Sequence, residues 1–158
     1  MQTANALRVF VLIPVKVLSQ SKSRWVGVPN SDRRAGLLAM LSSVVDAAAG
    51  ALGYDSCTII TNDIIIQQAA ENMGVVWMPD PGTDLNSTIE LAARKAFGEG
   101  ADGVMYLPAD VAAATASDVH EVVNASEHCT RPVAVPAERD GGTNALLMPA
   151  SASLPPLL

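Results

Sequence analysis

The sequence predicts one α/β domain with a mainly parallel β-sheet and helices on both faces of that sheet. Short apolar runs alternate with segments of helical spacing along most of the 158 residues, and this alternation favours parallel strands joined by right-handed crossover helices. The length suffices for one domain with a substantial core. The apolar fraction of 49% is ordinary for a globular protein.

The first predicted strand is the apolar run Val9–Ile13, which Pro14 ends. A continuous apolar run of this length is typical of a strand that is buried on both faces. The helix that follows has a good N-cap in Ser31 and apolar residues at helical spacing. We expect it to end near Gly50 or Gly53.

The second strand and helix follow the same scheme. The run Cys57–Thr61 predicts a strand, and either Asn62 or Asp63 can cap the next helix. That helix should run to about Met73, where Gly74 terminates it.

A long loop separates the third strand from its helix. Val75–Met78 predicts the strand, and the two prolines and one glycine of Pro79–Asp84 exclude regular structure after it. A helix should run from about Asn86 to Phe97, with glycines just beyond its end.

The last part of the chain supplies one more helix and three strands. The predicted elements are a strand at Gly103–Leu107, a helix capped by Thr115 or Ser117 that ends near Ser126, and strands at Pro132–Val135 and Ala145–Met148. We expect residues 1–148 to form the domain and the Ser/Pro-rich residues 149–158 to form a loose tail.

Charge and composition exclude several classes of function. The net charge of −6 and the pI of about 4.7 argue against non-specific nucleic-acid binding, which needs a basic surface. Cys57 and Cys129 have no metal-ligand spacing and form no cluster with the two histidines, so we expect structural cysteines. No apolar run approaches ~20 residues, and the N-terminus lacks the regions of a signal peptide, so we expect a cytoplasmic protein without membrane contact.

A cluster of cations follows the first strand. Lys16, Lys22 and Arg24 fall within nine residues and are spaced by small polar residues. Ligands of open α/β sheets bind just beyond the carboxyl ends of the strands, so this loop is a candidate cradle for a triphosphate. The alternative is a solvated charged loop, because lysine and arginine are mostly surface residues.

Asp110 stands just beyond the fourth strand, at the same predicted edge as Lys16. Carboxylates in such positions bind Mg²⁺ in phosphoryl-transfer enzymes, although Asp110 could instead anchor the next helix. Pro14, Pro79 and Pro108 should mark this edge, and Lys16 and Asp110 should converge on one ligand.

Other polar residues at this edge leave two interpretations open. Residues 62–63 and 84–86 could cap helices or bring an amide to a nucleotide base. No serine stands in a nucleophile elbow, and neither histidine indicates a catalytic triad.

The most unusual motif is the glycine pair of residues 141–142, which Thr143 and Asn144 follow. Two glycines permit positive φ and let a ligand approach the main chain closely. The hydroxyl and the amide behind them suit a phosphate or a carboxylate. The alternative is a plain hairpin turn.

Together these motifs resemble those of the 2-phospho-L-lactate guanylyltransferases of coenzyme F-420 biosynthesis, a family that includes enzymes for phosphoenolpyruvate or 3-phosphoglycerate. The resemblance runs in order along nearly the whole chain, through segments 13–24, 34–41, 79–86, 107–110 and 140–146. The cationic loop and the Gly-Gly-Thr-Asn motif are far more specific together than either is alone.

The resemblance implies a Rossmann-like nucleotidyltransferase fold of the nucleotide-diphospho-sugar transferase type. It also implies a Mg²⁺-dependent transfer of GMP from GTP to the phosphate of the acceptor, with release of pyrophosphate. By position, Lys16, Lys22 and Arg24 would hold the triphosphate as the catalytic cations, and Asp110 would bind Mg²⁺. Such a transfer needs positioning and charge neutralisation more than a covalent nucleophile.

The remaining site residues are also implied by the resemblance. The residues expected near the nucleoside are Thr61, Leu85 and Asn86, and those expected at the acceptor are Gly142, Thr143 and Asn144. Of these, Thr143 would contact the carboxylate of the acceptor.

The chain ends earlier than the family pattern, which continues with a closing segment and a further acidic metal ligand. We therefore expect these 158 residues to bind GTP and Mg²⁺ but to transfer GMP poorly. One alternative is a shortened homologue that binds a nucleotide or a partner without catalysis. Another is a different nucleotidyltransferase, such as a cytidylyltransferase of molybdopterin type. A second copy could cover the exposed end of the sheet and form a homo-oligomer.

Overall fold

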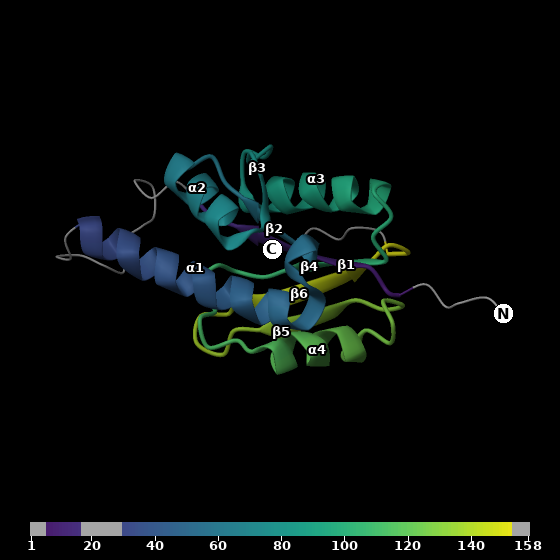
Figure 1. Ribbon diagram of the computed structural model, residues 1–158. Coiled ribbons are helices and arrows are strands. Elements are labelled where there is room, and N and C mark those ends of the chain that lie inside the picture. The colour runs from purple at the N-terminus through teal and green to yellow at the C-terminus, as the bar shows by residue number, and fades with distance from the viewer. Residues whose placement is uncertain (1–5, 17–29, 153–158) are drawn as a thin grey trace.

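The computed structural model describes residues 6–16 and 30–152, which form a six-stranded sheet flanked by helices (Figure 1). The strands are β1 (Val9–Pro14), β2 (Cys57–Ile60), β3 (Val76–Met78), β4 (Gly103–Tyr106), β5 (Val133–Pro136) and β6 (Thr143–Pro149). The helices are α1 (Asn30–Leu52), α2 (Ile64–Met73), α3 (Leu85–Gly98) and α4 (Ala116–Ala125), with a short 3-10 helix η2 (Tyr54–Ser56) before β2.

The strand order is β3-β2-β1-β4-β6-β5. Strands β1 to β4 pair in parallel, which confirms the expected mainly parallel sheet. Strand β6 runs antiparallel to both of its neighbours, β4 and β5. The loop between β5 and β6 is too short for a crossover helix, so the chain turns back as a hairpin.

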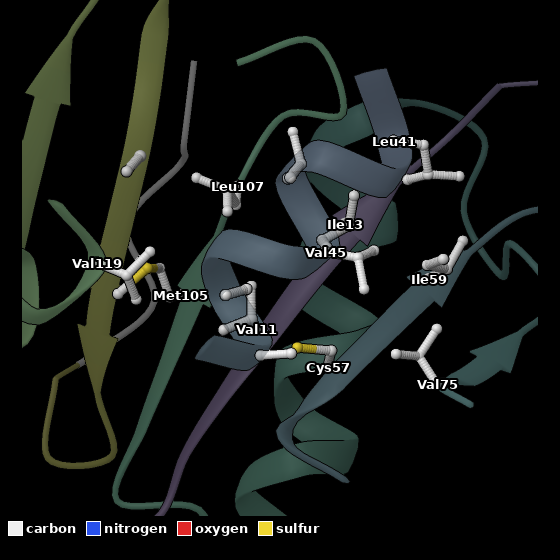
Figure 2. Close-up of a cluster of buried hydrophobic side chains, with 14 of the residues drawn as sticks. Val11, Ile13, Leu41, Val45, Cys57, Ile59, Val75, Met105, Leu107 and Val119 are labelled. Atoms are coloured by element: carbon white, nitrogen blue, oxygen red, sulfur yellow. The ribbon is translucent and has the colours of Figure 1, made fainter. Parts of the chain in front are cut away.

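Helices cover both faces of the sheet, as predicted. One core cluster joins α1, α2 and α4 to one face through residues such as Leu41, Ile66 and Val119. The second cluster joins α3 to the other face through residues such as Ile89. Figure 2 shows the first cluster, in which side chains of β1, β2 and β4 meet those of α1 and α4. Neighbouring residues of a strand point to opposite faces of the sheet, so strands such as β1 contribute side chains to both clusters.

Helix caps follow the sequence signals closely. Asp63 caps α2 by accepting hydrogen bonds from two backbone N–H groups, and Gly74 ends α2 with a φ of 74°. Asp84 caps α3, and Thr115 caps α4, each within a capping box. Helix α1 begins at Asn30, so Ser31 lies inside its first turn and not at the predicted N-cap position.

Helix α1 corrects one expectation of the sequence analysis. By length and composition alone, the stretch Ser31–Leu52 could cross a membrane. The core helix of a soluble protein meets the same criterion. Leu41, Val44 and Val45 of α1 are fully buried in the first core cluster, so one side of this helix packs against the sheet.

The two cysteines are free and buried, in agreement with a structural role. Burial raises the pKa of the Cys57 thiol from 9.0 to about 11, because a low-dielectric environment disfavours the thiolate.

Stability should therefore fall at alkaline pH in a way that depends on Cys57. The pKa is raised in the folded state, so its contribution is complete below pH 9.0 and is lost as pH rises toward about 11. The loss is on the order of 2 kcal/mol. Urea unfolding at about pH 8 and about pH 11 should show a smaller alkaline loss in Cys57→Ala than in the wild type. Equal losses in the two proteins would contradict the assignment.

Candidate functional site

The carboxyl ends of β1, β3 and β4 lie at one edge of the sheet. Pro14 is the last residue of β1, Pro79 directly follows β3, and Pro108 lies two residues beyond β4, which confirms that the three prolines mark strand ends at one edge. Backbone hydrogen bonds continue the pairing just past the strands, from Val15 N to Ile60 O at 2.8 Å and from Leu107 N to Leu12 O at 3.0 Å. The loops beyond this edge therefore start from fixed positions.

The first cleft is a cavity of about 630 Å³ between the loops that follow β1, β2, β3 and β4. Lys16 and Asp110 both line it, so the two residues lie at the same edge of the sheet, as expected. Their convergence on one ligand stays a prediction. Asn62, Asp80 and Leu85 contribute further to its wall.

The second cleft is a cavity of about 770 Å³ beside the β5–β6 hairpin. Its wall includes Arg139, Gly142, Thr143 and Asn144 from the hairpin. Asp110 also lines this cleft. The exposed carboxylate of Asp110 thus stands where the two clefts meet.

The loop between β3 and α3 is held by a dense set of hydrogen bonds. Asp80 accepts from the Thr88 hydroxyl and from Gly82 N, the latter at 2.9 Å. The Asn62 side chain accepts from Asp80 N at 2.9 Å and so ties the loop to the end of β2.

Gly82 is required in that loop because there is no space for a side chain at this position. A Cβ at this position would lie 2.5 Å from Thr88 Oγ1 and 2.6 Å from Ser87 Oγ. A side chain would therefore push the loop away from α3 and alter the first cleft.

The hairpin loop brings the glycine pair to the second cleft. Gly141 has a φ of 71°, and Gly142 N donates to Asp140 Oδ1 at 3.0 Å. Ala137 N donates to Gly142 O at 2.9 Å and closes the loop. The loop is therefore a hairpin that also lines a cavity, and its binding of a ligand stays a prediction.

Residues 9–154 match the family described as guanylyl transferase CofC like. The chain belongs to this family.

Known guanylyltransferases are similar to the chain over most of its length. A phosphoenolpyruvate guanylyltransferase from Rubrobacter xylanophilus is 34% identical over 150 residues, which cover 94% of this chain and 73% of the relative. The enzyme of the same name from Chloroflexus aggregans is 31% identical, with 92% of this chain and 74% of the relative covered.

Solved structures place the fold among nucleotidyltransferases. A protein assigned as a nucleotide-diphospho-sugar transferase, from Desulfovibrio desulfuricans, aligns with a TM-score of 0.75 at 21% identity, covering 94% of this chain and 66% of that one. A cytidylyltransferase from Leptospira borgpetersenii aligns with a TM-score of 0.63 at 14% identity, covering 92% and 62%. Family and fold agree, and the CofC-like chain is a nucleotidyltransferase.

Of the residues expected near the nucleoside of this CofC-like protein, some line the first cleft and others do not. Leu85 lines the first cleft, whereas Asn86 is half-buried and is not among the residues of its wall. Thr61 is fully buried, and its hydroxyl accepts from Asp63 N at 3.1 Å. Thr61 therefore supports the turn that presents its neighbour Asn62 and does not reach the cleft.

The cations of the expected triphosphate site are described only in part. Lys16 is exposed in the first cleft, while Lys22 and Arg24 lie outside the described residues. Among residues 6–16 and 30–152, no group of three or more His, Cys, Asp or Glu side chains could hold a metal ion. Asp110 thus offers a single carboxylate, which suits Mg²⁺ because this ion commonly takes one or two carboxylates together with substrate phosphates.

Sequence reasoning missed Tyr106, which lines both clefts. Burial, followed by the charge of Asp110, raises the pKa of this phenol above its ordinary value. Tyr106 is embedded in an apolar strand sequence, and only its position as the last residue of β4 could have signalled a place at the site.

Proposed function

We propose that this protein transfers GMP from GTP to a phosphorylated three-carbon acid and releases pyrophosphate. The acceptor is 2-phospho-L-lactate, phosphoenolpyruvate or 3-phosphoglycerate, and the reaction belongs to coenzyme F-420 biosynthesis in the cytoplasm. The observation that carries the proposal is the position of Asp110 at the junction of two clefts. The names of the guanylyltransferase relatives support GTP as the nucleotide and phosphoenolpyruvate as the acceptor.

The reaction joins two anions, and the proposal assigns one cleft to each. A phosphate oxygen of the acceptor attacks the α-phosphorus of GTP. A new phosphorus–oxygen bond forms, the bond to the bridging oxygen of the β-phosphate breaks, and pyrophosphate leaves with the electron pair. Holding both reactants in line is the main task of the protein, since orientation can supply several kcal/mol of the barrier reduction.

In this proposal the first cleft binds GTP. Lys16 neutralises the triphosphate together with Lys22 and Arg24, and Leu85 with Asn86 lies on the nucleoside side. Asp110 would hold Mg²⁺, which supplies neutralisation of phosphate charge when bound.

The second cleft binds the acceptor in this proposal. The Thr143 hydroxyl is a donor for a carboxylate, Gly142 lets the acceptor approach the main chain closely, and Asn144 adds an amide. The guanidinium of Arg139, which lines the same cleft, adds the positive charge that an acidic acceptor requires.

The deciding experiment measures pyrophosphate release with each of the three acids and with GTP, ATP, CTP or UTP. We expect release with GTP and most strongly with phosphoenolpyruvate. Release with CTP in place of GTP would indicate a cytidylyltransferase. GTP binding without release for any acid would indicate a nucleotide-binding homologue that does not catalyse transfer.

A further inference from the structure

Tyr106 occupies a central place at the functional edge of the sheet. It is the last residue of β4 and pairs with Leu12 of β1 and Leu146 of β6. Among the described residues, those that line both clefts are Tyr106, Pro108 and Asp110. These three residues therefore stand between the two clefts.

The ring and the hydroxyl of Tyr106 have different surroundings. The half-buried ring packs against the α3-side core cluster, which holds the side chain in place. Among the described residues, the hydroxyl makes no hydrogen bond and is not one of the buried polar atoms that lack a partner. Packing thus fixes the ring and leaves a hydroxyl that a ligand in the clefts can reach.

The chemistry of the junction requires a hydrogen-bond donor. A phosphate placed there lies beside the Asp110 carboxylate, and Pro108 has no donor group. Of the described residues shared by the clefts, only Tyr106 has a side chain that can donate. A phenol is protonated at neutral pH at its ordinary pKa, and burial with the charge of Asp110 raises the pKa of Tyr106 further, so the hydroxyl is a donor beside a carboxylate.

We propose that the Tyr106 hydroxyl donates a hydrogen bond to the acceptor's phosphate group at the junction of the clefts and orients it toward the α-phosphorus of GTP. This inference rests on the proposed guanylyl transfer. It assigns Tyr106 to recognition of the phosphate, whereas the hairpin residues recognise the carboxylate of the same acceptor.

The test compares Tyr106→Phe with Tyr54→Phe. The first substitution removes the hydroxyl and keeps the packed ring. The second removes an exposed hydroxyl in η2, before β2 begins, where Tyr54 donates to Asp46 Oδ1 at 3.4 Å. Calorimetry measures phosphoenolpyruvate binding in the presence of Mg²⁺ and an α,β-methylene analogue of GTP, which cannot transfer GMP.

We expect Tyr106→Phe to weaken phosphoenolpyruvate binding about tenfold to a hundredfold, the range for a hydrogen bond to a charged group. Affinity for the GTP analogue and the melting temperature should stay at wild-type values, and Tyr54→Phe should change none of these quantities. In turnover, the KM for the acceptor should rise in Tyr106→Phe, with the KM for GTP unchanged.

The other outcomes are equally decisive. Unchanged phosphoenolpyruvate affinity in Tyr106→Phe overturns the inference, and so does an equal loss of affinity for both ligands. A wild-type protein that binds none of the three acids overturns it as well. If the wild type binds phosphoenolpyruvate through Tyr106 but releases no pyrophosphate from GTP, the inference stands and the proposed function fails.

Discussion

Replacing Asp110 by asparagine should reduce guanylyl transfer about a thousandfold, the equivalent of roughly 4 kcal/mol of transition-state stabilisation. Asp110 is exposed and lines both clefts, so the substitution removes a charge from the site and disturbs no packing. The amide keeps the size of the side chain but cannot match the affinity of a carboxylate for Mg²⁺. Pyrophosphate release as a function of Mg²⁺ concentration measures the effect, and a higher Mg²⁺ requirement should accompany the loss of rate.

The matched control for this variant is Asp46→Asn. Asp46 is also exposed but lies on α1, outside the walls of both clefts. Both variants should unfold within about 0.5 kcal/mol of the wild type, as surface substitutions usually do. Full activity of Asp110→Asn at limiting Mg²⁺ would show that the carboxylate has no part in metal binding.

Replacing Lys16 by alanine should weaken GTP binding about tenfold to a hundredfold, because a charge-assisted contact is worth about 1.5–3 kcal/mol. Lys16 directly follows the buried Val15 at the end of β1, and its exposed side chain lines the first cleft. Titration calorimetry with GTP and Mg²⁺ measures the affinity directly, and the weaker binding should also raise the KM for GTP.

A comparison with Lys95→Ala separates a site contact from general electrostatics. Lys95 is an exposed lysine of α3 that lies 3.7 Å from Glu99 and outside the first cleft. Both substitutions change the net charge equally, so a difference between them reflects the position of Lys16 at the first cleft. Equal GTP affinities of the two variants would mean that Lys16 belongs to a solvated charged loop.

Local signals allowed much of the fold to be predicted. The apolar run of β1 is buried between two helical layers, and the caps Asp63 and Gly74 lie at the ends of α2, as their residue types predict. Such features depend on residues that are close in the sequence, so they can be predicted from one sequence alone. The direction of β6 is different, because an apolar run indicates burial and not the orientation of its partners.

The candidate site was predictable at the level of loops and less so at the level of side chains. Lys16 and Asp110 were found because each follows a strand that ends at one edge. Thr61 was misplaced because a turn begins just beyond β2, and a difference of one residue there separates a buried hydroxyl from the cleft-lining Asn62. Tyr106 was missed for the converse reason, since a residue inside a strand carries no local mark of a cavity beyond it.

The chain order of the two clefts has a consequence for how such enzymes diversify. Residues between Pro14 and Asp110 form the first cleft, and most of the wall of the second comes from the later stretch between Val135 and Asn144. That stretch is one hairpin joined to the rest of the sheet through β6. Under the proposed assignment of the clefts, a new loop sequence should therefore alter the choice of acid without altering the choice of nucleotide. Exchanging this single segment between homologues should therefore transfer the acceptor preference from one enzyme to the other.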